Sequence, residues 1–439
     1  MEILLSAIYA ALFVFIIVKV RFFHISGIRR QYMAGAFLLK VLFGVALSLI
    51  YADYYTDRKT GDTYKFFDDA KAIHDSREKG SAVYIKVLTG FGLENDPVAL
   101  DYYQQTMHLD RQYQVGFVND NATVVRLNAV LMWFSFGYYQ IHTIFWCFLS
   151  FIGLTGILKI LVKYFPRKKT AMFFSVFLLP TVLFWGSGVL KEPIFLLGLG
   201  LFLLGLFQYI YGHWSWKDIV ALIIGLLLLI LAKGYVLWCI LPACAGLLLA
   251  KFTGGRRFWL WFGLPHFLGL LLLFILPEID PNLNVADYMR QKQEAFYNVG
   301  ASSDAGSMLE VAPIDGPLAV VTGAPEAMMN TYLRPWPWEW SKILYIPAAI
   351  ENLMLLICLL VMLWNFRRPY GLEIPIFAFC ISFVLILGIL AGEVVPILGA
   401  LVRYKLPSLI FLFVAIFICT DHIMLQRRLP FVRRIIRKL

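Results

Sequence analysis

ALIIGLLLLILAKGYVLWCILPACAGLLLA, residues Ala221–Ala250, is an apolar stretch with one charged side chain, Lys233. Apolar runs of this kind are typical of helices that cross a bilayer, whose hydrocarbon core is about 30 Å thick. Lys233 and Gly234 divide the stretch into the runs 218–232 and 235–250. The sequence therefore predicts two membrane-spanning helices joined by a two-residue turn.

Comparable runs recur along the whole chain. Of its 439 residues, 60% are hydrophobic and 15% are charged, whereas soluble chains are about half apolar and about a quarter charged. This composition excludes a water-soluble enzyme and a receptor with a single anchor. The sequence predicts an all-α, polytopic membrane protein that forms a single membrane domain over residues 1–439. About eleven transmembrane helices are expected, near 4–20, 33–52, 141–164, 170–186, 192–211, 218–232, 235–250, 257–277, 343–364, 371–391 and 404–420.

The net charge of +11 comes from basic clusters in short loops. These clusters occupy alternate loops, as the positive-inside rule expects of cytoplasmic loops, so they indicate topology and not binding to nucleic acid. We expect the N-terminus outside and the basic tail inside. The clusters lie at 19–30, 163–169, 251–257, 367–368 and 427–438.

Two long polar loops, 53–125 and 278–342, then fall on the outer side, and both are richer in acidic than in basic residues. The first begins YADYYTDRKTGDTYKFFDDAKAIHD, residues Tyr51–Asp75, where aromatic and acidic residues alternate at helical spacing. This pattern predicts an amphipathic helix on the membrane surface. The apolar stretch Val124–Tyr139 is either an interfacial helix or an extension of the next span.

Several ionisable residues break the positive-inside rule. Charge at membrane depth is costly and is usually retained for a task. The basic members of the set are expected to converge at the outer boundary, where they could bind the phosphate of a lipid carrier. Alternatively, each could extend to the interface or pair with a headgroup or a local carboxylate. The set comprises Lys191, Glu192, Lys233, Arg403, Lys405 and Arg126.

Three patches resemble known membrane proteins. GDTYKFFDDA, Gly61–Ala70, resembles the first periplasmic loop of the GT-C glycosyltransferases, which use polyprenyl-phosphate sugar donors, and Asp62 matches the acidic position of that loop. LLPTVLFWGSGVLKEP (178–193) and LVRYKLPSLIFLF (401–413) are similar to segments of bacterial surface-polysaccharide membrane proteins. The chain departs from the pattern in its additional first helix, 4–20, and in lacking a metal-binding Asp-x-Asp pair.

The resemblance implies a transferase in the bacterial inner membrane with its active site facing the periplasm. The donor would be a polyprenyl-phosphate sugar, and the acceptor a lipid-linked or surface glycan. Asp62 and Glu192 would be the catalytic carboxylates. Substrate binding would fall to Lys191, Lys233, Arg403, Lys405, Arg126, Asp68 and Asp69. No cofactor is required, although Asp68–Asp69 leaves room for a divalent metal.

Each carboxylate also has a structural interpretation. Asp62 follows Gly61 as turn residues often do, Glu192 suits a helix N-terminus, and Asp68 and Asp69 could face solvent. Two other functions stay open: a polymerase or ligase of lipid-linked repeat units, whose second loop would hold the growing chain, and a transporter of such lipids. A transporter should carry ionisable residues at mid-membrane depth. We expect span interiors nearly free of such residues, which favours chemistry at the outer face.

Overall fold

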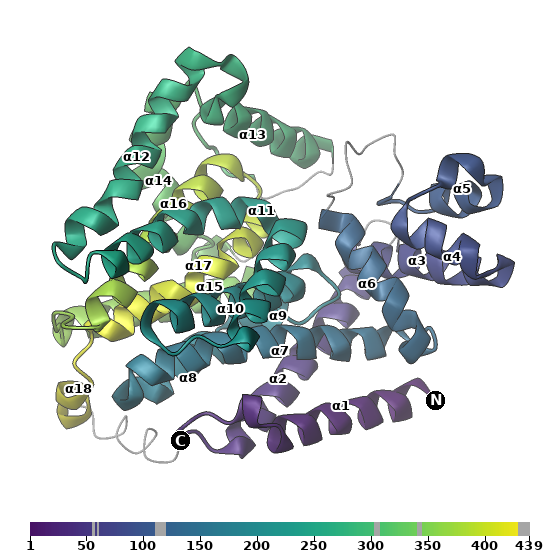
Figure 1. The fold of residues 1–439 in the computed structure, drawn as a ribbon, viewed down its shortest axis with the longest axis horizontal. Helices are drawn as coiled ribbons and strands as arrows, with labels where there is room; N and C mark the ends of the chain where they lie inside the picture. The colour runs from purple at the N-terminus through teal and green to yellow at the C-terminus, as the bar shows by residue number, and fades with distance from the viewer. Residues whose placement is uncertain (55–57, 59–60, 110–119, 303–307, 340–344, 429–439) are drawn as a thin grey trace. The chain divides into compact units, whose positions relative to one another are not determined.

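The computed structural model describes residues 1–54, 58, 61–109, 120–302, 308–339 and 345–428 (Figure 1). These residues form helices and no β-strand, apart from two isolated bridges. Among them, nine helices are long and apolar enough to cross a membrane. Those nine are α1 (Glu2–Lys19), α2 (Arg30–Tyr54), α7 (Tyr139–Tyr164), α10 (Lys191–Tyr211), α11 (Trp216–Phe252), α12 (Phe258–Ile279), α15 (Ile346–Trp364), α16 (Glu373–Val394) and α17 (Leu398–Cys419).

The expected span at 170–186 is broken. Its residues form two short helices, α8 (Lys169–Phe177) and α9 (Pro180–Trp185). Pro180 explains the break, since a proline disfavours helical geometry in the preceding residue and lacks an N–H to continue the ladder. Residues 186–190 after α9 are non-helical and buried, and irregular backbone at membrane depth is tolerated where protein covers it.

The expected spans 218–232 and 235–250 both lie within α11. The 37 residues of α11 comprise two helices that meet at a kink. Helical geometry fails at Lys233, where φ is −152° and ψ is 71°. The two predicted helices are therefore both present, and they meet at Lys233, within the predicted two-residue turn. The expected count is eleven and the candidate helices among the described residues number nine, because the span at 170–186 is broken into two short helices and the two helices of α11 are counted as one.

The chain divides into two compact units. The first contains Met1–Ile160 and Val182–Gly234, and the second contains Leu161–Thr181 and Tyr235–Leu439. In the first unit, α7 and α10 touch at glycines: a Cβ on Gly153 would lie 2.0 Å from the Leu196 carbonyl oxygen, and one on Gly200 would lie 1.9 Å from the Gly153 carbonyl oxygen. Small residues of this kind let helix backbones approach closely in a bilayer.

Four helices of the first unit lie between α2 and α7: α3 (Asp62–Asp75), α4 (Ser81–Thr89), α5 (Pro97–Gln104) and α6 (Asp120–Ser135). The amphipathic helix expected at the start of this loop is α3, but its apolar face, with Phe66 and Phe67, is buried where α3 packs against α6. A turn with left-handed geometry at Phe136 and Gly137 separates α6 from α7. Val124–Tyr139 is therefore not an extension of the following span.

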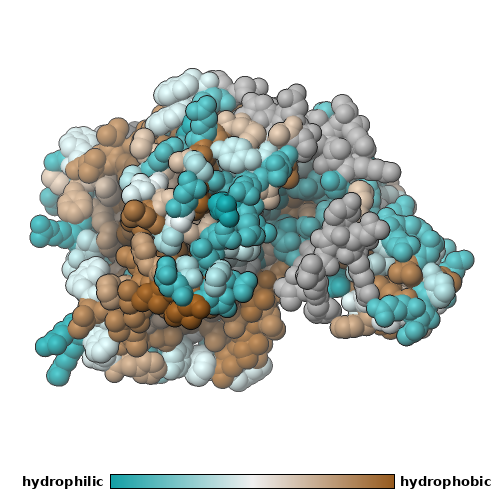
Figure 2. Space-filling model, turned by 90° about the horizontal axis from the view of Figure 1, so that it is seen from above, coloured by the Kyte–Doolittle hydropathy of each residue, from teal (hydrophilic) through white to brown (hydrophobic). Residues whose placement is uncertain are grey.

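The second unit adds α13 (Val285–Ser302) and α14 (Pro317–Leu333) between α12 and α15, and it ends with α18 (His422–Arg428). Apart from Glu278, the exposed large side chains of α12 are apolar, and only Phe262 of that helix is buried. Figure 2 shows broad hydrophobic areas on one face of the molecule. Apolar surface on this scale is compatible with contact with lipid. Short 3₁₀ helices lie at Arg21–Phe23, Ser76–Lys79, Leu93–Asn95, Pro166–Lys168, Pro281–Leu283 and Pro337–Glu339.

Candidate functional site

The first turn of α10 is fixed by the buried segment that precedes it. The Cys147 thiol on α7 donates to the Ser187 carbonyl at 3.2 Å. From α2, a Cβ on Gly44 would lie only 2.7 Å from the same oxygen. Residues 186–190 are thus packed tightly between two apolar helices, and α10 begins directly after them at Lys191.

Glu192 and Lys233 form a buried ion pair. The Lys233 Nζ lies 3.0 Å from the Glu192 Oε1, and the two side chains are 6% and 1% exposed. Lys233 reaches this position from the break in α11, and the hydroxyl of Thr123 on α6 donates to the nearby Leu231 carbonyl at 3.1 Å. Three helices far apart in sequence, α6, α10 and α11, are therefore connected around one buried pair.

The neighbouring residue, Lys191, forms a second pair that water can reach. Its Nζ lies 2.5 Å from Asp120 Oδ2 on α6, and the side chains are 19% and 48% exposed. Lys191 and Lys233, two of the basic residues expected to converge, are thus both bound to carboxylates near the first turn of α10. Lys191 pairs with Asp120 of α6, and Lys233 pairs with Glu192 of α10. Lys191 is the accessible member, and Lys233 is the enclosed one.

Arg126 fastens α6 to α4. Its Nε donates to the Leu88 carbonyl at 2.9 Å and its Nη2 to the Thr89 carbonyl at 3.1 Å. These carbonyls belong to the last turn of α4, where helices leave acceptors without internal partners. Burial lowers the pKa of the Arg126 guanidinium from its usual value. The observed contacts give Arg126 a helix-capping role, and a contact with substrate stays a prediction.

The three candidate aspartates among the four of α3 differ in their surroundings. Asp62 is the first residue of the helix and is partly exposed. Asp68 accepts two hydrogen bonds from Arg58, both at 2.8 Å, and they raise the pKa of Arg58. Asp69 is buried and accepts from the backbone N–H of Met107 at 2.8 Å and of His108 at 2.9 Å.

Asp69 therefore holds a distant segment in place and is not on the solvent face that one interpretation of the sequence expected. Asp68 pairs with Arg58 and has a side chain that is 32% exposed, as that interpretation expected. Within the described residues, no group of three histidine, cysteine or acidic side chains is arranged to hold a metal ion. Asp62, at the helix start, is partly open to solvent, where a ligand can reach it.

In the second unit, Lys405 lies in a fully buried network. Its Nζ donates to Asn352 Oδ1 at 2.8 Å and to the Arg334 carbonyl at 3.3 Å. The adjacent Glu351 accepts from the backbone N–H of Thr181 at 2.9 Å and from its hydroxyl at 2.5 Å. With these partners Lys405 braces α15 and α17.

Arg403, two residues before Lys405 in α17, is partly exposed. Its neighbour Tyr404 stacks on Tyr235, with ring centroids 5.2 Å apart and planes 16° from parallel. Both candidate cations of α17 belong to the second unit, and Lys191 and Lys233 belong to the first. The convergence of Arg403 with those lysines stays a prediction.

The expectation of span interiors nearly free of ionisable residues has buried exceptions. Lys40 lies near the middle of α2, is buried, and donates to the Val182 carbonyl at 3.3 Å. Glu351 is buried inside α15. Sequence reasoning passed over both, although each is a single charge within an apolar run and so carries a visible signal. The charge distribution therefore no longer argues against a transporter.

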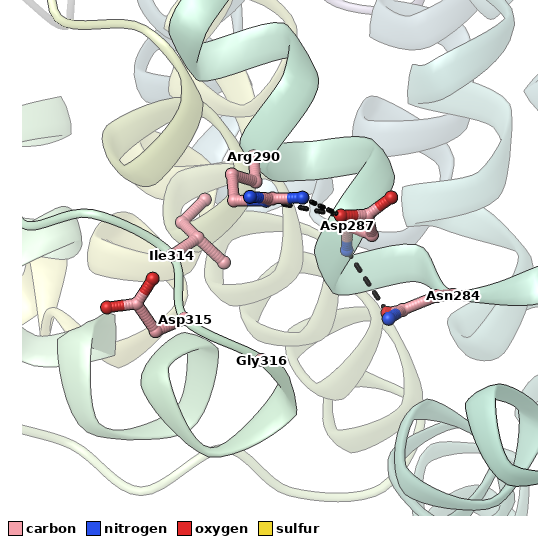
Figure 3. Close-up of a pocket in the computed structure, with 6 residues that line it drawn as sticks. All are labelled: Asn284, Asp287, Arg290, Ile314, Asp315 and Gly316. Carbon is pink, nitrogen blue, oxygen red and sulfur yellow. Dashed lines mark hydrogen bonds and ion pairs between the residues drawn. The ribbon is translucent and has the colours of Figure 1, made fainter. Parts of the chain in front are cut away.

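A shallow pocket of about 180 Å³ lies in the second unit, between the starts of α13 and α14 (Figure 3). Asn284 Oδ1 accepts from the Asp287 N–H at 3.1 Å, and Asp287 pairs with Arg290 one turn on. Figure 3 shows Asp315 across the pocket from this pair. The pocket thus combines carboxylates, a guanidinium and an amide, which together donate and accept hydrogen bonds.

No protein family, no curated protein and no solved structure was found to match this chain.

Proposed function

We propose that the chain is a membrane glycosyltransferase of the GT-C type. It would move a sugar from a polyprenyl-phosphate donor to a lipid-linked or surface-glycan acceptor at the outer face of the bacterial inner membrane. The observation that carries the proposal is a pair of lysines around the first turn of α10, Lys191 from α10 itself and Lys233 from the break in α11. The Lys191 side chain is 19% exposed, and the buried Glu192–Lys233 pair connects α10 and α11.

Lys191 supplies the positive charge that stabilises a departing phosphate. An ammonium group binds phosphate oxygens by charge-assisted hydrogen bonds, and the positive end of the α10 dipole adds to the attraction. Asp120, which now holds Lys191, is half exposed. The lysine can therefore exchange this carboxylate for a phosphate oxygen without uncovering a buried charge.

Asp62 is the proposed general base. Its carboxylate takes the proton of an acceptor hydroxyl while the hydroxyl oxygen bonds to the anomeric carbon of the sugar. The bond between that carbon and the phosphate oxygen breaks, and the polyprenyl phosphate leaves with the negative charge that Lys191 stabilises. Positioned acid–base groups contribute about 10²–10⁴-fold to rate.

The test measures sugar transfer from a panel of polyprenyl-phosphate donors in proteoliposomes. We expect Asp62→Asn and Lys191→Met to reduce transfer by about 10²-fold or more. Asp101→Asn is the matched control, because Asp101 is an exposed aspartate of the same loop. Absence of transfer from every donor, or full activity in Asp62→Asn and Glu192→Gln alike, would contradict the proposal.

The pocket between α13 and α14 favours a second candidate, a polymerase or ligase of lipid-linked repeat units. Pockets that orient a ligand through a few polar groups are typical binding sites, and sugar hydroxyls suit the groups present here. In this case Arg290→Ala should shorten the glycan product without slowing the first transfer. An unchanged product length would leave the single-sugar transferase as the better proposal.

A further inference from the structure

Glu393 is a buried carboxylate in the last turn of α16. Its side chain is 4% exposed, and neither carboxylate oxygen has a hydrogen-bond partner among the described residues. Its backbone carbonyl, by contrast, accepts from Gln293 Nε2 on α13 at 2.7 Å. The backbone carbonyl of Glu393 thus has a hydrogen-bond partner, while its carboxylate has none among the described residues.

Three helices, α13, α14 and α17, pack against α16. From α14, Gly323 faces the carboxylate, and a Cβ at that position would lie 3.1 Å from Glu393 Oε1. No charged side chain on these helices bonds to the Glu393 carboxylate, and neither does any of their tyrosine hydroxyls. Those charged side chains are Asp287, Arg290, Lys292, Glu294, Glu326, Arg403 and Lys405.

An ionised carboxylate in this position is doubly unfavourable. Burial without a partner costs free energy, and the last turn of a helix carries the negative end of its dipole. The chain then leaves helical geometry over residues 395–397, and Val395 and Pro396 are buried. Helix C-termini next to irregular buried backbone are places where membrane proteins bind small cations.

We propose that the Glu393 carboxylate is a binding site for a small monovalent cation, either a proton or Na⁺. The site would be neutral when occupied, and the α14 backbone at Gly323 leaves the space for the ion beside Oε1. This inference does not depend on the glycosyltransferase proposal, because the two concern different residues and their tests have separate readouts.

Labelling with dicyclohexylcarbodiimide, an apolar carbodiimide, tests the site in the full chain in lipid nanodiscs. A protonated carboxyl adds across one C=N bond: its proton goes to nitrogen and its oxygen bonds to the central carbon. The adduct rearranges to an N-acylurea with no group lost. Mass spectrometry should then find the label at Glu393 at mildly acidic pH.

Two series of labelling experiments, one at varied pH and one in Na⁺ or K⁺ salts, distinguish a proton site from a Na⁺ site. If the site takes a proton only, labelling falls as pH rises and is the same in Na⁺ and K⁺ salts. If it takes Na⁺, then at constant pH Na⁺ protects Glu393 from labelling and K⁺ does not. No label at Glu393 from mildly acidic to mildly alkaline pH, in either salt, would overturn the proposal.

Glu351 is the matched control, since it is equally buried in an apolar helix but accepts two hydrogen bonds from Thr181. It should stay unlabelled, and equal labelling of Glu351 and Glu393 would also overturn the proposal. Glu393→Gln should remove the label. Gly323→Ala retains the carboxylate but places a methyl group against Oε1, so it should change the pH or Na⁺ dependence of labelling several-fold.

Discussion

The start of α10 and the start of α17 each bury a lysine near a glutamate, but they satisfy it differently. At α10, Lys233 bonds directly to Glu192 at 3.0 Å. At α17, Lys405 bonds to an amide and a backbone carbonyl, while Glu351 takes its hydrogen bonds from Thr181. In one region the two charges therefore neutralise each other directly, and in the other they are bound by several neutral groups.

The largest effect on stability is expected at the Glu192–Lys233 pair. Lys233→Met leaves the Glu192 carboxylate buried without its cation, which should lower the free energy of unfolding by about 3–5 kcal/mol. Denaturant titration in detergent micelles measures it. Adding Glu192→Leu to Lys233→Met should restore most of the loss, because apolar replacement of a whole buried pair is often neutral. No recovery in the double variant would contradict the direct neutralisation of Glu192 by Lys233.

Lys168 extends the comparison to a lysine bound to backbone carbonyls. Its Nζ donates to the Phe417, Ile418 and Thr420 carbonyls at the end of α17, and burial lowers its pKa to about 8. Between pH 8 and 10.5 the unfolded chain retains this proton while the folded chain has lost it. Stability should therefore rise with pH across that window, by about 3 kcal/mol in total.

Lys168→Met should remove this rise, and unfolding measured at a series of pH values compares the two proteins. The difference between their curves isolates Lys168 from other groups that titrate in the same range. Parallel curves would show that the carbonyls do not hold a lysine of lowered pKa.

Thr181→Val probes the distributed network with little change of shape. It removes the hydroxyl that donates to Glu351 Oε1 at 2.5 Å but retains the backbone N–H. The expected cost is about 1.5–3 kcal/mol, the range for hydrogen bonds to charged groups. Thr322→Val is the control, since Thr322 is an exposed threonine whose hydroxyl bonds within its own helix. Equal effects of the two substitutions would argue against the network.

The smallest effect is expected at the accessible pair. Lys191→Met should change stability by less than about 1 kcal/mol, because exposed ion pairs contribute little even when they are short. A double-mutant cycle with Asp120→Asn measures the coupling. A coupling as large as that of Lys233 with Glu192 would show that Lys191 is enclosed, and it would weaken its proposed role in binding phosphate.

The all-helical membrane class could be predicted because hydropathy over a long window identifies it. The same averaging concealed the break around Pro180, where a buried non-helical segment is as apolar as a helix. At Lys233 the topology rule identified an unusual lysine, but it could not show that Glu192 would neutralise it. Glu393 was missed because a single carboxylate near the end of an apolar run does not reveal whether a partner reaches it.

The contact between Gly153 and Gly200 has a consequence for how the first unit assembles. Lipid provides no hydrophobic drive to bring inserted helices together, so α7 and α10 must associate through close backbone packing. Each glycine lies against the other helix's backbone, and one added methyl group at either position would force the helices apart. Evolution should therefore tolerate few substitutions at Gly153 and Gly200, although neither has a side chain. The site at the first turn of α10 can form only after α7 and α10 have met.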